Sequence, residues 1–366
     1  MALVSSQTIA KDFSSFQSTY EYMHSRLKSL MPEAEIALKS EMVMAIHKMK
    51  KEKNVLILGH NYMEPALYHA VADICGDSLK LARQGASSSH TTIMVCGVRF
   101  MAETAKILSP HKTILLPNHK AGCSLAASMT GEDIRHLRQL YPGVPVVSYV
   151  NTYADVKAES DICCTSSNAV AVVNALSSDM VIFVPDRYLA ANVAQQTGKQ
   201  LIVAQKEAHS SSVKTTTITG SSSSDNTMIT WNGTCEVHEK FEVDDINQIK
   251  AQYGDSVAIL AHPECSLDVC EAADFSGSTS SMIDFVQNTK ASRYLLLTEC
   301  AMADNIIAQN PQKELLRMCS YRCPHMATIT LPMVLHCLET FTENIDLDPT
   351  IQKQAFKALK RMTEIG

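Results

Sequence analysis

The sequence predicts an α/β protein made of three similar α/β units around a pseudo-threefold axis, preceded by an N-terminal helical arm. The prediction rests on an internal repeat: three short β-rich runs end in polar residues, and each leads to a helical pattern, a second strand and a cysteine. The chain has 366 residues, 46% of them hydrophobic, which is enough for several buried cores. The expected division is an arm at 1–53 and units at 54–143, 144–255 and 256–366.

The arm is expected to contain one clear helix. Between Pro32 and Lys53, Leu38, Met42, Ala45 and Met49 recur at helical spacing, and proline is tolerated in a first helical turn. The residues before Pro32 are expected to form a looser segment or short helices.

Each unit is expected to begin with a buried strand whose last residues are polar. These strands are expected at Asn54–Gly59, Val144–Ser148 and Ser256–Ala261, and they lead into His60, Tyr149 and His262. Second strands are expected at Thr92–Cys96, Met180–Val184 and Tyr294–Leu297. Ligands of open parallel sheets bind outside the carboxyl ends of the strands, so these polar residues are candidates for a site.

Small hydroxyl residues stand where the helix after each first strand begins. Ser78, Ser166 and Thr279 occupy matching places in the three units. Any one of them could be an ordinary N-cap. As a set they are better explained as anion-binding helix starts.

Each unit then reaches a cysteine: Cys123, Cys235 or Cys323. His60 and Cys123 are 63 positions apart and His262 and Cys323 are 61 apart, whereas Tyr149 and Cys235 are 86 apart. A Ser/Thr-rich insertion near 206–228 explains the excess, since eleven of the fifteen residues from 210 to 224 are Ser or Thr. We expect a flexible surface loop that is dispensable for folding.

Three thiolates that converge on the axis suit an iron–sulfur cluster or a zinc ion. The nine other cysteines are expected to be reduced, as in a cytoplasmic protein, and mostly to fill cores. A second metal site from Cys265, Cys270 and Cys300 is the less favoured interpretation.

The charge and hydropathy pattern excludes some classes of partner. The net charge is −6 and the pI is about 6.1, without a basic face, so no nucleic-acid partner is expected. No run is long and apolar enough for a membrane span, and no secretory signal is expected, so a cytoplasmic location is predicted.

At this level of detail the sequence resembles the quinolinate synthase family, through short motifs that run in order over about residues 54–340. They are Gly59-His-Asn-Tyr62, Gly76-Asp-Ser78, Asn118-His-Lys-Ala-Gly-Cys123, Ser148-Tyr-Val-Asn-Thr152, Thr165-Ser-Ser167, Trp231-Asn-Gly-Thr-Cys-Glu-Val-His238, His262-Pro-Glu264, Gly277-Ser-Thr279 and Cys323-Pro-His-Met326.

The resemblance implies three α/β sandwich domains and a definite reaction. Members of the family condense iminoaspartate with dihydroxyacetone phosphate to quinolinate, with loss of phosphate and water. They use a [4Fe-4S] cluster on three cysteines, which leaves one iron open. It also implies a functional partner, aspartate oxidase or aspartate dehydrogenase, that supplies iminoaspartate. We expect a monomer or a homodimer.

The resemblance also assigns site residues. Cys123, Cys235 and Cys323 would be the ligands, and Cys323 is preferred to Cys319 because it precedes proline. Glu264 would be the general base, with a pKa raised by its environment. The expected catalytic group also contains Tyr62, Tyr149 and His262. The expected substrate-binding group is His60, Ser78, Tyr149, Val150, Asn151, Ser166, His262, Pro263, Glu264 and Thr279.

Two other interpretations of the residues stay open. One is a different three-cysteine cluster enzyme, such as the four-iron reductase of the non-mevalonate isoprenoid pathway. The other is a metal or redox sensor without catalytic activity. The Tyr-Val-Asn and His-Pro-Glu strand ends favour quinolinate synthase over the reductase. The sensor interpretation would leave the three hydroxyl helix starts, His60, His262 and Glu264 without a role.

Overall fold

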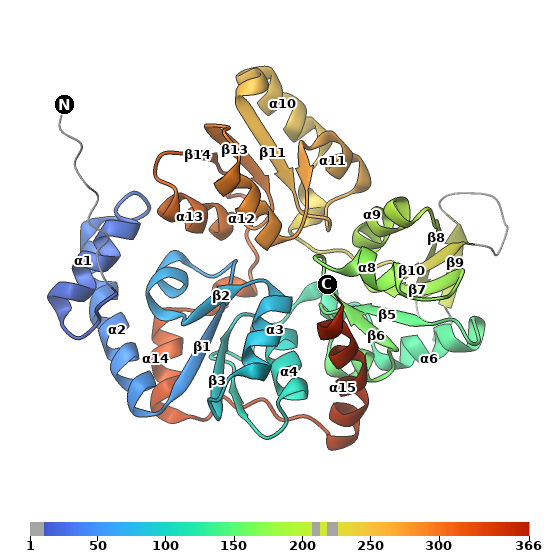
Figure 1. Cartoon of the computed structure of the whole chain (residues 1–366), viewed down its shortest axis with the longest axis horizontal. Coiled ribbons are helices and arrows are strands. Elements are labelled where there is room, and N and C mark those ends of the chain that lie inside the picture. Colours follow the sequence, from blue (N-terminus) through green and yellow to red (C-terminus); the bar gives the residue numbers. More distant parts are fainter. Residues whose placement is uncertain (1–10, 207–212, 218–225, 366) are drawn as a thin grey trace.

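The computed structural model describes residues 11–206, 213–217 and 226–365. Three α/β lobes lie around a common centre, each built on its own sheet, and a helical arm packs against the first (Figure 1). The fold class predicted from the internal repeat is confirmed. None of the helices in these residues is both long and apolar enough to cross a membrane.

The arm consists of α1 (Phe16–Leu27) and α2 (Glu33–Glu52). Pro32 is the N-cap of α2, so the predicted helix is confirmed. The buried residues Ile36, Val43 and Ile46 follow the helical period and pack in the same core as the first sheet.

The first lobe has a four-stranded parallel sheet in the order β2-β1-β3-β4. Its elements are β1 (Val55–His60), η1 (Leu67–Val71), β2 (Ile74–Gly76), α3 (Ser78–Ser87), β3 (Thr92–Cys96), α4 (Arg99–Leu108), β4 (Thr113–Leu115) and α5 (Ser124–Ala127).

The second lobe has six strands in the order β6-β5-β7-β10-β8-β9. Its elements are α6 (Gly131–Leu140), β5 (Val146–Tyr149), α7 (Ala154–Ala158), β6 (Ile162–Cys164), α8 (Ala169–Asn174), β7 (Met180–Val184), α9 (Arg187–Thr197), β8 (Gln200–Lys206), β9 (Val213–Thr217), β10 (Thr227–Trp231) and η2 (His238–Lys240).

The third lobe repeats the first order, as β12-β11-β13-β14. Its elements are α10 (Val243–Tyr253), η3 (Gly254–Ser256), β11 (Val257–Ala261), α11 (Leu267–Ala272), β12 (Phe275–Ser276), α12 (Thr279–Asn288), β13 (Arg293–Leu297), α13 (Cys300–Gln309), β14 (Glu314–Leu316) and η4 (Met326–Thr328).

Two C-terminal helices leave the third lobe. Helix α14 (Leu331–Thr340) packs on α2, and α15 (Pro349–Glu364) packs on α4, α7 and β6 (Figure 1). Their buried residues, including Val334 and Leu359, belong to the apolar core of the first two lobes. The range predicted for the third unit, 256–366, therefore contains one helix that packs on the arm and one that joins the first two lobes.

An aspartate at the same place in each lobe shows how closely the repeat is built. Asp73, Asp161 and Asp274 each accept a 2.8 Å bond from a backbone N–H of the lobe's first strand. Each also pairs with a base on the preceding helix: Lys50 on α2, Arg138 on α6 or Lys250 on α10. Each repeat thus begins with a helix that the predicted boundaries at 54, 144 and 256 place in the preceding segment.

We expect Asp73→Ala to lower the free energy of unfolding by about 1–3 kcal/mol, because it removes a charged acceptor from a strand N–H and from the buried Lys50. Asp73→Asn keeps an acceptor oxygen and should lose less. Urea unfolding would measure both, with the exposed Asp255→Ala as the control. Equal losses in the Asp73 and Asp255 variants would contradict this role.

The extra length of the second unit includes strand structure. Strand β10 lies beside β7, just as β4 lies beside β3 and β14 beside β13 in the other lobes. Strands β8 and β9 have no counterpart in the described residues of those lobes. Strand β9 lies inside the predicted insertion and pairs antiparallel with β8, so the expectation of a loop throughout is wrong for Val213–Thr217. The rest of that expectation falls on 207–212 and 218–225, outside the described residues.

Replacing residues 207–225 by a short Gly-Ser linker should cost no more than about 2 kcal/mol of unfolding free energy. Within the described ranges, the deletion removes only the edge strand β9, and individual cross-strand pairs are worth about 0.2–1 kcal/mol. Thermal unfolding of the shortened and full chains would test this. An insoluble product, or a much larger loss, would mean that the segment is needed for folding.

Candidate active site

A cavity lies where the three lobes meet, and residues of all three lobes line it. All predicted site residues line it except Pro263, whose carbonyl instead accepts a 3.0 Å bond from the Asn192 side chain. The residues that do line it are His60, Tyr62, Ser78, Cys123, Tyr149, Val150, Asn151, Ser166, Cys235, His262, Glu264, Thr279 and Cys323.

Two histidines at equivalent strand ends are held in the same way. His60 ends β1 and His262 follows β11, and each accepts a backbone N–H bond at Nδ1 from the residue two positions later. Burial lowers the pKa of His60 to about 4 and that of His262 to about 3. Both rings are therefore neutral near pH 7, and the Nδ1 bonds assign their protons to Nε2.

Glu264 is the centre of a buried hydrogen-bond network. Its carboxylate is 2.7 Å from His238 Nδ1, accepts a 3.0 Å bond from Asn151 Nδ2, and accepts a bond from the Tyr149 hydroxyl. Burial alone would raise the pKa of Glu264, but these donors and the nearby imidazoles lower it well below its usual range. The prediction of a raised pKa is therefore wrong, and Glu264 is an ionised carboxylate.

His238 extends this network to the other side of the cavity. Its Nε2 is 2.9 Å from Thr298 Oγ1, and Thr298 Oγ1 is 2.6 Å from the Tyr62 hydroxyl. Burial and the charge of Glu264 raise the pKa of Tyr62 and Tyr149 well above its ordinary value, so both are protonated hydroxyls.

The sequence interpretation gave no role to His238, Thr298 or Glu299, which also faces the cavity. The one signal for His238 was its place three residues after Cys235, inside a motif already recognised. Burial raises the pKa of Glu299 to about 7, so this carboxyl group titrates near neutral pH.

The three predicted hydroxyl residues reach the cavity but are not the helix caps. The N-caps of α3, α8 and α12 are Asp77, Asn168 and Ser278. Asp77 and Ser278 come one position before the predicted hydroxyl residue, and Asn168 comes two positions after it. The alternative that Ser78, Ser166 and Thr279 are ordinary N-caps is therefore wrong. Ser166 Oγ lies 3.4 Å from His262 Nε2, and Thr279 Oγ1 accepts a 2.9 Å bond from Asn61.

The three candidate ligand cysteines are free thiols that share one local geometry. Each stands just before a short helical turn, and its sulfur accepts backbone N–H bonds from the residues two and three positions later. Burial raises the pKa of Cys123 to about 12, that of Cys323 to about 11, and that of Cys235 well above its usual value. The N–H bonds oppose this effect, since they favour the thiolate.

One group in the cavity has the spacing of a single-ion site. Within the described ranges, ligand atoms of Cys235, His238 and Glu264 lie within 4.8 Å of one another. Cys123 and Cys323 lie outside that compact group.

The expectation that every cysteine is reduced is wrong for one pair. Cys300 and Cys319 form a disulfide, so neither is a free thiol, whereas Cys323 is free and lines the cavity. Cys300 is thereby removed from any second metal site. Cys265 and Cys270 are buried in the apolar core of the third lobe. The fold and the cavity together define a three-lobed α/β protein with a thiol-rich polar site at the junction of its lobes.

Comparison with known proteins identifies the family. A sequence profile described as "Quinolinate synthetase A protein" matches residues 44–364. The chain is 46% identical to the quinolinate synthase of Sinorhizobium fredii, over 94% of this chain and 88% of that protein. It is also 46% identical to quinolinate synthase 2 of Mesorhizobium japonicum, over 96% and 100% of the two chains. The chain belongs to the quinolinate synthase family and is an enzyme.

Proposed function

We propose that this chain condenses iminoaspartate with dihydroxyacetone phosphate to quinolinate, with loss of phosphate and water, and that it holds a [4Fe-4S] cluster on Cys123, Cys235 and Cys323. The observation that carries the proposal is the presence of three free thiols in one cavity with the polar strand ends of all three lobes, in a chain of this family.

The donor set suits such a cluster. Thiolates are the ligands of iron–sulfur clusters, and each candidate sulfur already accepts backbone N–H bonds that stabilise a negative charge. When bound through three cysteines, the cluster supplies an open iron that acts as a Lewis acid toward a substrate oxygen.

The substrates would be held by neutral donors. The two substrates carry two carboxylates and one phosphate, yet no lysine or arginine is among the cavity-lining residues that the structure describes. The Nε2–H groups of His60 and His262 would bind carboxylate oxygens, together with the hydroxyls of Ser78, Ser166 and Thr279. Arg99, Lys120 and Arg187, which lie near the cysteine loops or helix starts in the sequence, do not line the cavity.

Proton transfer would use the buried network. Tyr62 and Tyr149 are protonated hydroxyls, and each can donate to an oxygen of the substrate when its hydrogen turns away from its present partner, Thr298 or Glu264. His238 links Glu264 to the other hydroxyls: its Nδ1 is 2.7 Å from the Glu264 carboxylate, and its Nε2 is 2.9 Å from Thr298 Oγ1 and 3.5 Å from the Tyr62 hydroxyl. In this arrangement the proposed general base, Glu264, acts directly or through His238.

The substrate chemistry implies a supplying enzyme. Iminoaspartate is an imine that water hydrolyses, so it must be made close to its use by oxidation of aspartate. We propose aspartate oxidase or aspartate dehydrogenase as the functional partner.

Anaerobic iron and sulfide analysis joined to a quinolinate assay tests the proposal. Purified chain should contain iron and sulfide in the ratio of a [4Fe-4S] cluster and should form quinolinate from both substrates. A cluster without quinolinate formation would favour another cluster enzyme, such as the isoprenoid-pathway reductase. A protein that binds no cluster and forms no product would favour a sensor.

A further inference from the structure

In the first two lobes, a backbone bond ties the cysteine loop to the helix beside it. The N–H of Arg99, the first residue of α4, donates to the carbonyl of Ala121 at 2.7 Å. The N–H of Arg187, the first residue of α9, donates to the carbonyl of Gly233 at 2.9 Å. Each acceptor lies two residues before the cavity cysteine, so the same bond holds Cys123 and Cys235 in register with a helix N-terminus.

The third lobe is built differently at this position. The equivalent bond would join Cys300, the first residue of α13, to Tyr321, but the described part of the chain contains none. The carboxylate of Glu299 takes over instead: it accepts a 2.7 Å bond from the Ala301 N–H and another from the backbone N–H of Cys323. Glu299 is only 5% exposed, so these bonds are shielded from water.

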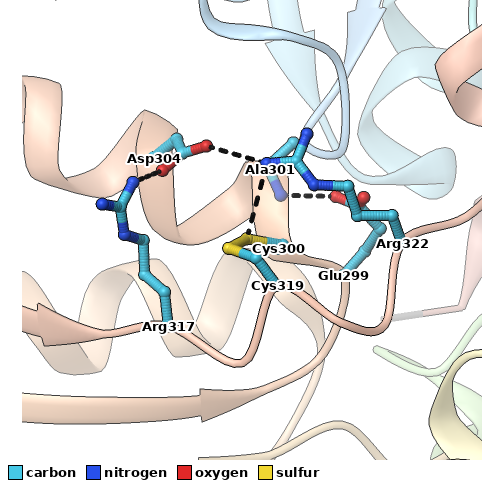
Figure 2. Close-up of a disulfide and its surroundings, with 7 residues drawn as sticks. All are labelled: Glu299, Cys300, Ala301, Asp304, Arg317, Cys319 and Arg322. Carbon is cyan, nitrogen blue, oxygen red and sulfur yellow. Dashed lines mark hydrogen bonds and ion pairs between the residues drawn. A yellow bond between two sulfur atoms is a disulfide. The ribbon is translucent and has the colours of Figure 1, made fainter. Parts of the chain in front are cut away.

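Further contacts fasten the same loop to the same helix (Figure 2). The Cys300–Cys319 disulfide joins them with the two Cα atoms 5.1 Å apart. Asp304 on α13 pairs with Arg317 at 2.6 Å and lies 4.0 Å from Arg322. Both arginines are largely exposed, so the pairs add little strength by themselves. Glu299 is buried and, unlike these pairs, bonds to the backbone of Cys323 itself.

We propose that Glu299 is a positioning residue for Cys323, which it holds at the cavity by joining the backbone of the Cys323 loop to the N-terminus of α13, with the Cys300–Cys319 disulfide as a second fastening. A side chain thus does in the third lobe what a backbone bond does in the other two. The inference rests on the proposed function only where it concerns the cluster, because the position of the Cys323 thiol can be measured without one.

Alkylation of the protein without its cluster tests this directly. Iodoacetamide labelling of Cys323 and Cys123 is followed by mass spectrometry, without reductant, in wild type, Glu299→Ala and Glu299→Gln. In Glu299→Ala we expect Cys323 to react about threefold to tenfold faster and Cys123 to react at the wild-type rate, since a lost hydrogen bond changes a local opening equilibrium by about that factor.

The conservative variant separates position from charge. Glu299→Gln keeps an acceptor oxygen and removes the charge, so Cys323 should react within about twofold of the wild-type rate if the hydrogen bonds are what matters. Equal acceleration in the Gln and Ala variants would mean that the carboxylate acts only through its charge, and would overturn the proposal. So would an unchanged rate in Glu299→Ala, or equal acceleration of Cys323 and Cys123, which would indicate general unfolding.

Two further variants complete the design. The double substitution Cys300→Ser with Cys319→Ser should also accelerate labelling of Cys323 selectively. Glu314→Ala, which removes an exposed carboxylate of the same lobe, should not. A disulfide-free chain with the wild-type Cys323 rate would overturn the role of the disulfide.

The cluster gives an independent readout. In anaerobically loaded protein, Glu299→Ala should release iron to a chelator about threefold to tenfold faster than wild type, followed by loss of visible absorption. Equal release rates would overturn the proposal while the cluster itself stands. If wild-type chain takes up no cluster, the proposed function fails, and the alkylation rates still decide the role of Glu299.

Discussion

Replacing Cys123, Cys235 or Cys323 by serine should abolish both the cluster and quinolinate formation. A serine hydroxyl is a poor ligand for iron at neutral pH, because it stays protonated where the cysteine sulfur binds as thiolate. The two remaining cysteine ligands would not hold a cluster that is bound through three. Visible absorption, iron and sulfide content, and product formation should therefore fall together in each of the three variants, to below about a hundredth of wild-type activity.

Two controls make the result specific. Cys96→Ser removes a buried thiol that does not line the cavity, and it should keep both cluster and activity. Cys319→Ser should still take up the cluster, since that thiol is paired with Cys300. A Cys319 variant that loses the cluster while the Cys323 variant keeps it would mean that the third ligand is misassigned.

The repeat could be predicted from sequence because each lobe encodes it locally. Buried runs such as Val55–His60 are almost continuously apolar and end in a polar residue, which is the pattern of a parallel strand covered on both faces. The packing of α14 and α15 could not be predicted in this way. Their apolar faces show that they are buried, but not which lobe buries them.

The strand β9 was missed for a related reason. Serine- and threonine-rich sequence has few apolar side chains, so it predicts a solvated loop. Threonine nevertheless fits a strand well, and an edge strand needs only backbone partners, which β8 provides.

The sequence predicted which residues form the candidate site, but not the hydrogen bonds between them. The three strand ends, the hydroxyl residues and the cysteines occur at repeated places, so their convergence followed from the symmetry. Glu264 and His238 belong to different repeats, and their 2.7 Å contact depends on how the lobes meet. That contact reverses the expected pKa shift of Glu264, which no local pattern encodes.

The Cys300–Cys319 disulfide shows the same limit. The two residues are 19 positions apart, on a helix start and in a loop, and their pairing depends on how β14 and α13 pack. The expected reducing compartment argued against any disulfide.

Glu264→Gln should retain the cluster and lower kcat by about 10²–10⁴-fold, the usual worth of a placed acid–base group. Glutamine has nearly the same size but no charge, and its amide cannot accept bonds at both positions from His238, Asn151 and Tyr149. The acid limb of the wild-type kcat profile should not follow Glu264, because its pKa lies below the ordinary range and the carboxylate stays ionised throughout the working range. Cluster absorption and quinolinate assays at several pH values would measure both effects.

A second variant tells whether Glu264 acts by itself or through His238. If the carboxylate serves to hold the Nδ1 proton of His238, then His238→Gln should lose a similar factor in kcat, and the double variant should be little worse than either single one. Losses that multiply would show that the two groups act in separate steps. If Glu264→Gln turns over at nearly the wild-type rate with its cluster intact, Glu264 only binds or supports, and Tyr62 and Tyr149, whose hydroxyls stay protonated because burial raises their pKa, become the next candidates.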